Sequence, residues 1–173
     1  MGVRNLILSA LTGLVLLVAS SSSAYAAEPR EIGVFHDWTA YVLSERGQKV
    51  CYMVSVPIKA QGKYTKRDDI FALITHRPAQ STKDVFSYIT GYTYKPGSDA
   101  SVTIDGKKYT LFTQGDTAWT PDAEADATLA VAIQKGSNMI VKGTSKRGTL
   151  TTDTFSLKGS GDAYKAISKE CGV

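Results

Sequence analysis

The chain consists mostly of short runs of strand-forming residues separated by turn residues, and no other feature restricts its fold as much. Val, Ile, Thr, Tyr and Phe suit the pleated, half-buried surface of a strand, whereas Gly, Pro, Asn and Asp interrupt it. This pattern predicts a mainly β protein. The expected strands cover residues 34–43, 49–58, 70–77, 85–94, 101–104, 108–114, 139–145 and 150–157.

Local sequence adds detail to this pattern. Asp105-Gly106 is a strong two-residue turn signal and predicts a hairpin between the strands that flank it. Residues 70–77 (IFALITHR) are apolar on both faces, which favours a central strand. Residues 60–69 (AQGKYTKRDD) are polar and basic, and we expect them to form a loop.

Two segments have a helical pattern. Residues 120–136 (TPDAEADATLAVAIQKG) place Thr120 as the expected N-cap before a proline, with acids in the first turns and apolar residues at helical spacing. Residues 161–173 are expected to form a shorter helix at the C-terminus. We therefore expect an antiparallel β-sandwich or a strongly curved sheet, with one mid-chain helix and a short C-terminal helix.

The first 26 residues have the pattern of a secretory signal peptide. Arg4 precedes an apolar run over residues 6–19, and Ala24-Tyr25-Ala26 forms a small-x-small cleavage site. The run is shorter than the about 20 apolar residues of a membrane span. Cleavage after Ala26 would leave residues 27–173 as a single domain with 19 basic and 16 acidic residues, a net charge of +3. This charge is too small and too mixed for a nucleic-acid-binding surface.

The two cysteines, Cys51 and Cys171, are expected to pair. In an oxidising compartment two cysteines usually form a disulfide, and free thiols are the alternative. Cys51 shares a strand face with Met53, while Cys171 continues the apolar face of the C-terminal helix. A Cys51–Cys171 bond would fasten that helix to the strand. Neither histidine has ligand spacing with a cysteine, so we expect no metal and no cofactor.

Several motifs, in order along the chain, carry a family resemblance. They are Asp37-Trp38, Lys49-Val50-Cys51-Tyr52, Thr75-His76-Arg77-Pro78, Gly91-Tyr92, Lys95-Pro96-Gly97-Ser98, Val102-Thr103-Ile104-Asp105-Gly106-Lys107, Leu111-Phe112-Thr113, Gly115-Asp116-Thr117-Ala118-Trp119, Lys142-Gly143-Thr144-Ser145, Arg147-Gly148-Thr149 and Lys169-Glu170-Cys171-Gly172. On these motifs the sequence resembles the invasion-associated locus B family of exported bacterial proteins. The family often has a further cysteine after the first Trp, where this chain has Tyr41-Val42-Leu43. The resemblance implies a role in host-cell entry and virulence, but no reaction and no defined ligand.

A basic and aromatic cluster is the expected binding surface. Tyr64, Arg67 and Arg147, together with neighbouring lysines at 63, 66 and 146, could contact an anionic glycolipid such as lipopolysaccharide, or an envelope or host protein. The alternative is a solvated loop without a ligand.

The remaining aromatic residues have two interpretations. Tyrosines and a phenylalanine at 86, 88, 92 and 94 share one strand parity and could bind sugars or peptides, or pack in the core. Trp38 and Trp119 are expected core anchors. His36 is expected to pack on the same strand face as Trp38.

His76 is the residue best suited to catalysis at neutral pH. It could form a triad with Ser87 or Ser98 and an aspartate, but no spacing selects these partners and no G-x-S-x-G motif is present. The alternative is a strand-end histidine that is hydrogen-bonded to a loop. Asp116 and Asp153 could be paired carboxylates, although a turn cap and a solvated strand face are their expected places.

Together these observations predict an exported, non-catalytic cell-envelope protein that acts by binding. Its expected location is the periplasm, the outer membrane or the outside of the cell. A small periplasmic hydrolase or enzyme modulator that uses His76 is the alternative, and a cleft joining His76 to a serine and an aspartate would favour it.

Overall fold

The computed structural model describes residues 28–173, so the expected signal peptide and its cleavage site lie outside the described residues. These residues form one sheet in which every neighbouring pair is antiparallel, in the order β1-β2-β3-β5-β6-β9-β8-β7-β10-β11-β4. The strands are β1 (Arg30–Phe35), β2 (Trp38–Glu45), β3 (Gln48–Ser55), β4 (Lys59–Gly62), β5 (Phe71–Arg77), β6 (Thr82–Ile89), β7 (Ala100–Ile104), β8 (Lys107–Gln114), β9 (Thr117–Trp119), β10 (Asn138–Thr144) and β11 (Leu150–Ser156).

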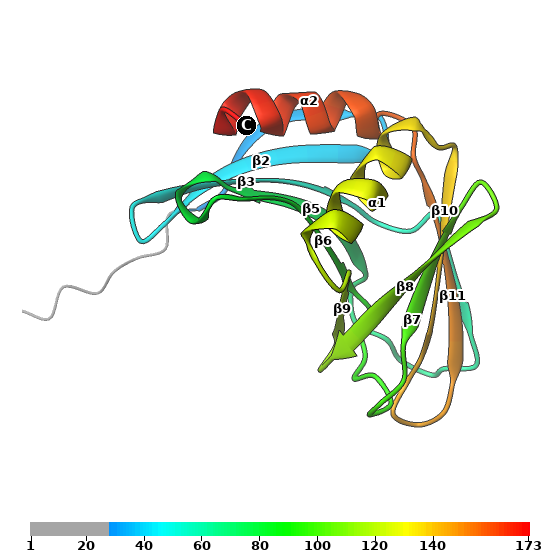
Figure 1. The fold of residues 1–173 in the computed structure, drawn as a ribbon. Helices are drawn as coiled ribbons and strands as arrows, with labels where there is room; N and C mark the ends of the chain where they lie inside the picture. The colour runs from blue at the N-terminus through cyan, green and yellow to red at the C-terminus, as the bar shows by residue number, and fades with distance from the viewer. Residues whose placement is uncertain (1–27) are drawn as a thin grey trace, which may run out of the picture.

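The sheet bends sharply between its two halves (Figure 1). β8 pairs with both β9 and β7, so it connects the half that contains β1 to β6 with the half that contains β10 and β11. Of the two predicted architectures, the protein therefore has the strongly curved sheet. The mainly β prediction is confirmed.

Two helices cover one side of this sheet (Figure 1). α1 (Ala123–Lys135) packs against β6, and α2 (Ser160–Cys171) lies over β1, β2, β3 and β5. Thr120 is not the N-cap of α1, as the sequence had suggested. Asp122 takes that position and accepts a hydrogen bond from the Ala125 amide at 2.8 Å. Neither helix is long and apolar enough to cross a membrane.

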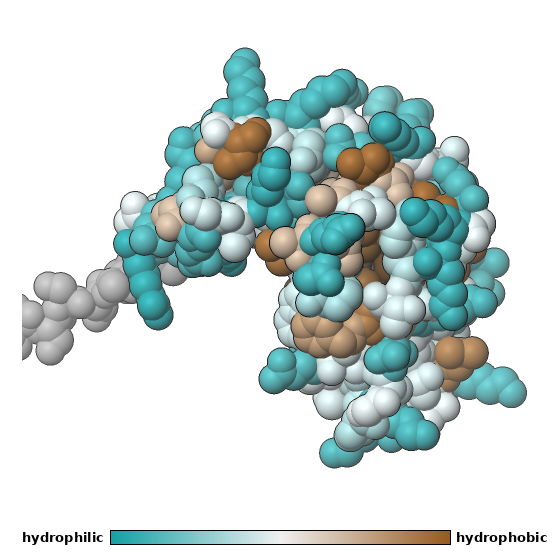
Figure 2. All heavy atoms as spheres, in the orientation of Figure 1, coloured by the Kyte–Doolittle hydropathy of each residue, from teal (hydrophilic) through white to brown (hydrophobic). Residues whose placement is uncertain are grey.

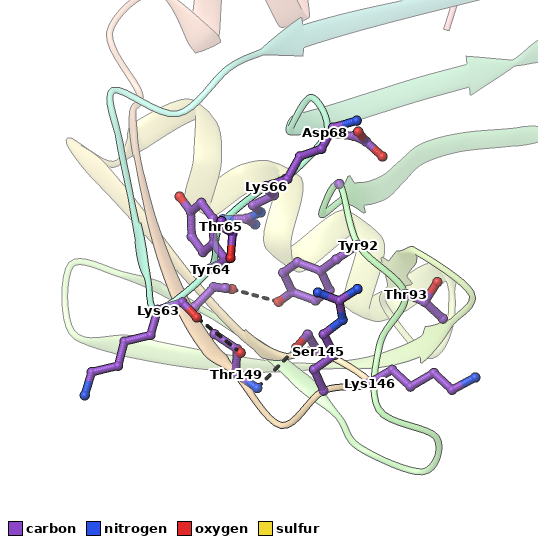
Figure 3. Close-up of a pocket in the computed structure, with 14 residues that line it drawn as sticks. Lys63, Tyr64, Thr65, Lys66, Asp68, Tyr92, Thr93, Ser145, Lys146 and Thr149 are labelled. Atoms are coloured by element: carbon purple, nitrogen blue, oxygen red, sulfur yellow. Dashed lines mark hydrogen bonds between the residues drawn. The ribbon is translucent and has the colours of Figure 1, made fainter.

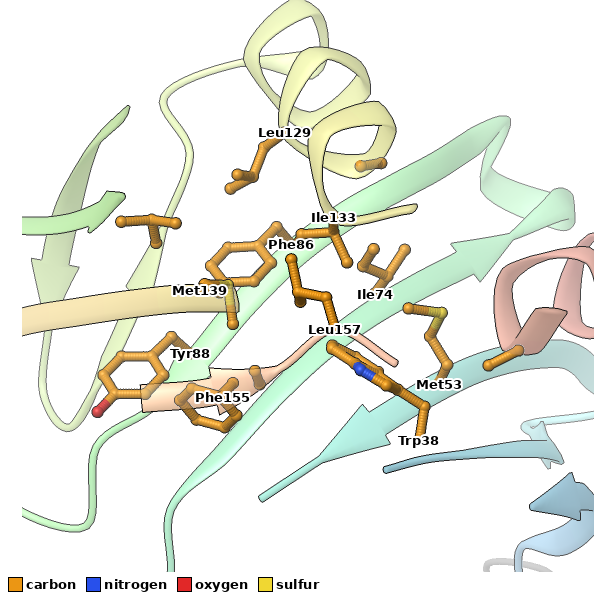
Figure 4. Packing of buried hydrophobic residues seen from close by; sticks show 14 of the residues in the cluster. Trp38, Met53, Ile74, Phe86, Tyr88, Leu129, Ile133, Met139, Phe155 and Leu157 are labelled. Atoms are coloured by element: carbon orange, nitrogen blue, oxygen red, sulfur yellow. The ribbon is translucent and has the colours of Figure 1, made fainter. Parts of the chain in front are cut away.

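The core lies between the two halves of the sheet and the helices (Figure 4). Trp38 on β2 is fully buried, as predicted, and its indole Nε1 donates to the Ser156 carbonyl oxygen at 3.0 Å. That bond joins β2 to β11 across the core. The side chains that meet there include Met53, Ile74, Phe86, Leu129, Ile133, Met139, Phe155 and Leu157.

The segment expected as a single strand over residues 34–43 is instead a hairpin. β1 ends at Phe35, His36 and Asp37 form the turn, and β2 begins at Trp38. His36 adopts a positive φ of 53° and is exposed, so its predicted packing beside Trp38 is wrong. The sequence shows no glycine or asparagine at this turn, which is why the pattern reads as continuous.

Most other strand predictions hold, with shifted ends. Asp105 and Gly106 form the predicted hairpin turn, both with positive φ, and β5 lies between β3 and β6 as a central strand. The expected loop over residues 60–69 is wrong in its first part, because β4 pairs with β11 there. The strand expected over residues 85–94 ends at Ile89.

A disulfide joins Cys51 on β3 to Cys171 at the end of α2, with a Cα–Cα distance of 6.0 Å. On α2, Ala163, Ile167 and Cys171 are buried, as their helical spacing predicts. The bond therefore fastens the C-terminal helix to the predicted face of β3.

Candidate functional site

The three residues of the predicted binding surface, Tyr64, Arg67 and Arg147, line one pocket of about 720 Å³, which we call the basic pocket (Figure 3). The segment after β4 forms one wall, the segment after β6 forms the second, and the turn between β10 and β11 forms the third. The fold thus brings together residues about 80 positions apart, which the sequence alone could only group by composition.

Backbone contacts hold these walls in place. The Asp68 amide donates to the Gly91 carbonyl oxygen at 3.0 Å, and the Lys146 amide donates to the Thr93 carbonyl oxygen at 2.8 Å. Gly91 has a φ of +70°, and a Cβ atom there would lie 2.2 Å from the Asp68 carbonyl oxygen. Only glycine fits this close approach. The pocket is therefore formed before any ligand arrives.

Arg67 forms the floor of the basic pocket through a buried ion pair with Asp153 on β11. Two guanidinium nitrogens donate to the two carboxylate oxygens at 2.7 Å each, and Nε donates to the Thr90 carbonyl oxygen at 2.6 Å. The side chains of Arg67 and Asp153 are 3% and 0% exposed. Tyr88 also donates its hydroxyl to Asp153. Burial and the adjacent carboxylate raise the pKa of Tyr88, so the hydroxyl keeps its proton.

This arrangement changes the roles expected for two residues. Asp153 was expected on a solvated strand face and is instead fully buried, so that expectation is wrong. Arg67 lies in the predicted site, but its charge is neutralised by Asp153 and each of its three guanidinium nitrogens already donates a hydrogen bond within the protein. Its guanidinium lies between the rings of Tyr64 and Tyr92, at 5.5 and 4.9 Å from their centres. Arg67 thus positions two aromatic side chains rather than offering a free charge.

The free charge of the basic pocket lies on its rim. The exposed cations are Lys63, Lys66, Lys146 and Arg147, and Asp68 is the exposed acid. Within residues 28–173, no ion pair engages any of them. Hydroxyl groups of Ser145, Thr149 and Thr93 lie among them (Figure 3). Cations, hydroxyls and tyrosine rings in one pocket suit an anionic ligand that also carries hydroxyl groups.

His76 lies elsewhere, fully buried on β5 beneath α2. Its Nε2 is 3.1 Å from the Ser168 hydroxyl, and its Nδ1 accepts from the Asp84 backbone amide at 3.0 Å. The Asp84 carboxylate is 3.9 Å from Nδ1. The structure therefore does place a serine and an aspartate beside His76, although Ser168 is neither of the two serines considered from the sequence.

The hydrogen bonds of this cluster are the reverse of those in a catalytic triad. A triad needs a carboxylate that accepts a proton from Nδ1, so that Nε2 is free to take the serine proton. Here Nδ1 is itself the acceptor, because a backbone N–H can only donate. The ring proton must then sit on Nε2, which donates to Ser168. The cluster joins α2 to β5 and β6 and is not arranged as a general base.

His76 also predicts a pH dependence of stability. Burial lowers the pKa of His76 in the folded protein, and the opposing charge of Asp84 does not offset it. The unfolded histidine, with a pKa of about 6.5, then binds more protons than the folded one, so stability should fall as pH drops below about 6.5. Between pH 7.5 and 5, the melting temperature of His76→Asn should decrease less than that of the wild type. The amide oxygen of this variant can replace Nδ1 as the acceptor. An equal decrease in both proteins would contradict this assignment.

The other predicted residues have mixed outcomes. Trp119 is only half-buried and stacks on the exposed ring of Phe112, with ring centres 5.6 Å apart, so it is not a core anchor. Phe86, Tyr88 and Tyr94 pack in the core, whereas Tyr92 faces the basic pocket. Asp116 lies in the β8–β9 turn, where its carboxylate accepts from the Thr117 hydroxyl at 2.9 Å.

Comparisons with known proteins identify the family of the chain and a similar fold. The sequence model of the invasion associated locus B (IalB) protein family matches residues 38–168. The crystal structure of invasion associated protein B from Bartonella henselae has a similar fold, with a TM-score of 0.55 and 11% sequence identity. The match covers 83% of this chain and 97% of that chain. Among curated proteins, none matches the sequence.

Proposed function

Because the chain belongs to the invasion associated locus B family, we propose that it is an exported, non-catalytic envelope protein that binds an anionic envelope or host component through the basic pocket. The observation that carries this proposal is the set of unpaired cations on the rim, above two tyrosine rings that Arg67 holds in place. A phosphorylated sugar headgroup, as in lipopolysaccharide, has the matching chemistry. The name of the related Bartonella henselae structure, invasion associated protein B, supports a role in contact with a host.

The hydrolase alternative has less support. The cluster of His76, Ser168 and Asp84 has the right residue types, but the Asp84 amide fixes the wrong tautomer for a general base. We therefore expect folded His76→Asn to keep the binding activity of the protein.

Binding of lipopolysaccharide micelles tests the proposal. The double substitution K66E/R147E reverses two rim charges and should weaken binding at least about 10-fold, because each cation is lost and a repelling charge is added. Wild-type binding should weaken with added salt, since charges at this surface are screened. Isothermal titration calorimetry at two salt concentrations measures both effects.

Lys108→Glu is the matched control, since Lys108 is exposed on β8 and lies outside the basic pocket. It should bind like the wild type. A preparation of the same lipopolysaccharide without its phosphates should bind weakly to every variant. Equal affinity of the double variant and the wild type would reject the basic pocket as the binding site.

A further inference from the structure

The basic pocket has a lining without aliphatic side chains. Among the described residues, its walls and floor consist of lysines, arginines, threonines, one serine, one aspartate, one glycine and two tyrosines. A site for an acyl chain needs apolar side chains, because each CH₂ group that leaves water must find apolar contacts. Figure 2 shows mainly hydrophilic and intermediate residues at the lower end of the molecule, where Figure 1 places the β10–β11 turn that forms the third wall. The lining therefore suits a polar ligand.

The floor of the basic pocket also closes the way to the hydrophobic core. The side chains of Arg67 and Asp153 are almost fully buried in their ion pair, and Tyr88 donates to the same carboxylate. The ring of Tyr88 in turn packs against Phe155 of the core, with ring centres 6.1 Å apart. An acyl chain could enter the core here only by separating the ion pair, which would leave a buried charge without a partner. The pocket thus ends at Arg67.

The volume of the basic pocket fits a small polar ligand. About 720 Å³ lies within the roughly 300–1,000 Å³ of sites that enclose a small molecule. The backbone contacts of Asp68 with Gly91 and of Lys146 with Thr93 fix the walls around this space. A phosphorylated mono- or disaccharide is a ligand of this size.

Tyr64 offers a surface for a sugar ring. The residue is 38% exposed, whereas Tyr92 is half-buried and its hydroxyl lies 2.7 Å from the Thr151 hydroxyl. Arg67 lies over the Tyr64 ring at 5.5 Å and holds it in place. The apolar C–H groups of a sugar ring can pack on an aromatic side chain while its hydroxyl groups remain hydrogen-bonded. A phosphate without a sugar gains nothing from this contact.

The charges of the rim match two kinds of ligand group. Lys66 belongs to the segment after β4, and Lys146 and Arg147 belong to the β10–β11 turn, so cations line the pocket from two walls. Asp68 is an exposed acid in the same lining. The cations attract a phosphate and Asp68 repels it, whereas a hydroxyl group can donate to the Asp68 carboxylate. A ligand with both groups matches the rim better than phosphate alone.

We propose that the basic pocket recognises the phosphorylated saccharide of an envelope glycolipid and leaves the acyl chains outside. The protein then docks on the carbohydrate of the glycolipid in place, and it neither extracts nor carries the lipid. This inference rests on the binding function proposed for the same pocket and adds which part of the ligand is bound. Tyr64 determines specificity, because it contacts the sugar and not the phosphate.

Competition between soluble and acylated ligands tests the proposal. The phosphorylated saccharide released from lipopolysaccharide by complete deacylation should displace the purified protein from lipopolysaccharide micelles, with a Kd within about 3-fold of the Kd for the micelles. The same saccharide without its phosphates should bind at least about 10-fold more weakly. Vesicles of phosphatidylglycerol, which has a phosphate and acyl chains but no sugar ring, should also bind at least about 10-fold more weakly than the micelles.

Two substitutions at one position separate the sugar from the phosphate. Tyr64→Leu should weaken binding of the deacylated saccharide at least about 3-fold, because the sugar loses its aromatic contact. Tyr64→Phe keeps the ring and should bind like the wild type. Inorganic phosphate should bind the wild type and both variants with equal affinity, and more weakly than the saccharide. Circular dichroism confirms that the variants fold.

The outcomes that contradict the inference differ from the one that rejects the pocket. If the deacylated saccharide failed to compete while K66E/R147E still weakened binding of the micelles, the pocket would require acyl chains. If Tyr64→Leu weakened binding of the saccharide and of inorganic phosphate equally, the pocket would be a simple anion site. Either result would overturn the inference and leave the proposed function standing. Unchanged binding of the micelles by K66E/R147E would instead overturn both.

Discussion

Replacing Arg67 with methionine is expected to lower the free energy of unfolding by about 3–5 kcal/mol, although Arg67 lies in a surface pocket. The substitution leaves the Asp153 carboxylate, which is 0% exposed, without its bidentate partner. It also removes the donors to Thr90 and to the Tyr88 oxygen. A buried charge without a partner is one of the few changes with an effect this large. Urea unfolding of wild type and variant measures the difference.

The pair should behave as a unit. The double variant Arg67→Met with Asp153→Leu should be more stable than Arg67→Met alone, because removing both charges removes the uncompensated one. Arg147→Ala, in the same pocket but exposed, should change stability by no more than about 0.5 kcal/mol. If Arg67→Met lowered the free energy of unfolding by less than about 1 kcal/mol, water would have to reach Asp153 in the folded protein. That result would contradict the burial of the ion pair below the basic pocket.

The sequence could predict three residues that line the basic pocket, but not which of them carry free charge. Tyr64, Arg67 and Arg147 stood out by residue type, and the fold places all three around one pocket. The burial of Asp153 could have been predicted from strand alternation. Asp153 shares a strand face with Thr151 and Phe155, and all three are buried. An aspartate at core parity needs a cation. Nothing local could identify Arg67 as that cation, because it lies 86 positions away.

The spacing of apolar residues predicted the regular elements of the fold but not its tight turns. The C-terminal helix was predictable because its apolar residues recur at helical spacing, and the central strand because its sequence is apolar on both faces. The His36–Asp37 turn was not, since the segment contains neither glycine nor asparagine and positive φ, which His36 adopts, is uncommon for any residue but glycine. The half-buried residues of β3 and β5 show the same limit in reverse. Val54 and Leu73 look like core positions in the sequence, yet they are paired neighbours on the sheet face opposite the buried one and are only half-buried within residues 28–173.

The second large effect is expected at the Cys51–Cys171 bond, which holds the end of α2. Two exposed ion pairs support the same end: Arg30 and Lys49 lie 3.0 and 3.7 Å from the Glu170 carboxylate, and Lys49 also donates to the Glu170 carbonyl oxygen at 3.0 Å. Exposed ion pairs of this kind contribute about 0–1 kcal/mol each. The disulfide closes a loop with a sequence separation of 120 residues. Such a closure stabilises the fold by up to about 5 kcal/mol by restricting the unfolded chain. The covalent bond should therefore dominate.

Cys51→Ser and Cys171→Ser should each lower the free energy of unfolding by a similar amount, up to about 5 kcal/mol, and the double variant should be no less stable than either single one. The reason is that either substitution removes the whole cross-link. Reducing the wild type with dithiothreitol should bring its melting temperature close to that of the double variant, while the double variant should not respond to the reductant. Additive losses in the double variant would mean that the two sulfur atoms stabilise the fold separately, through packing of Cys51 in the core and of Cys171 at the end of α2.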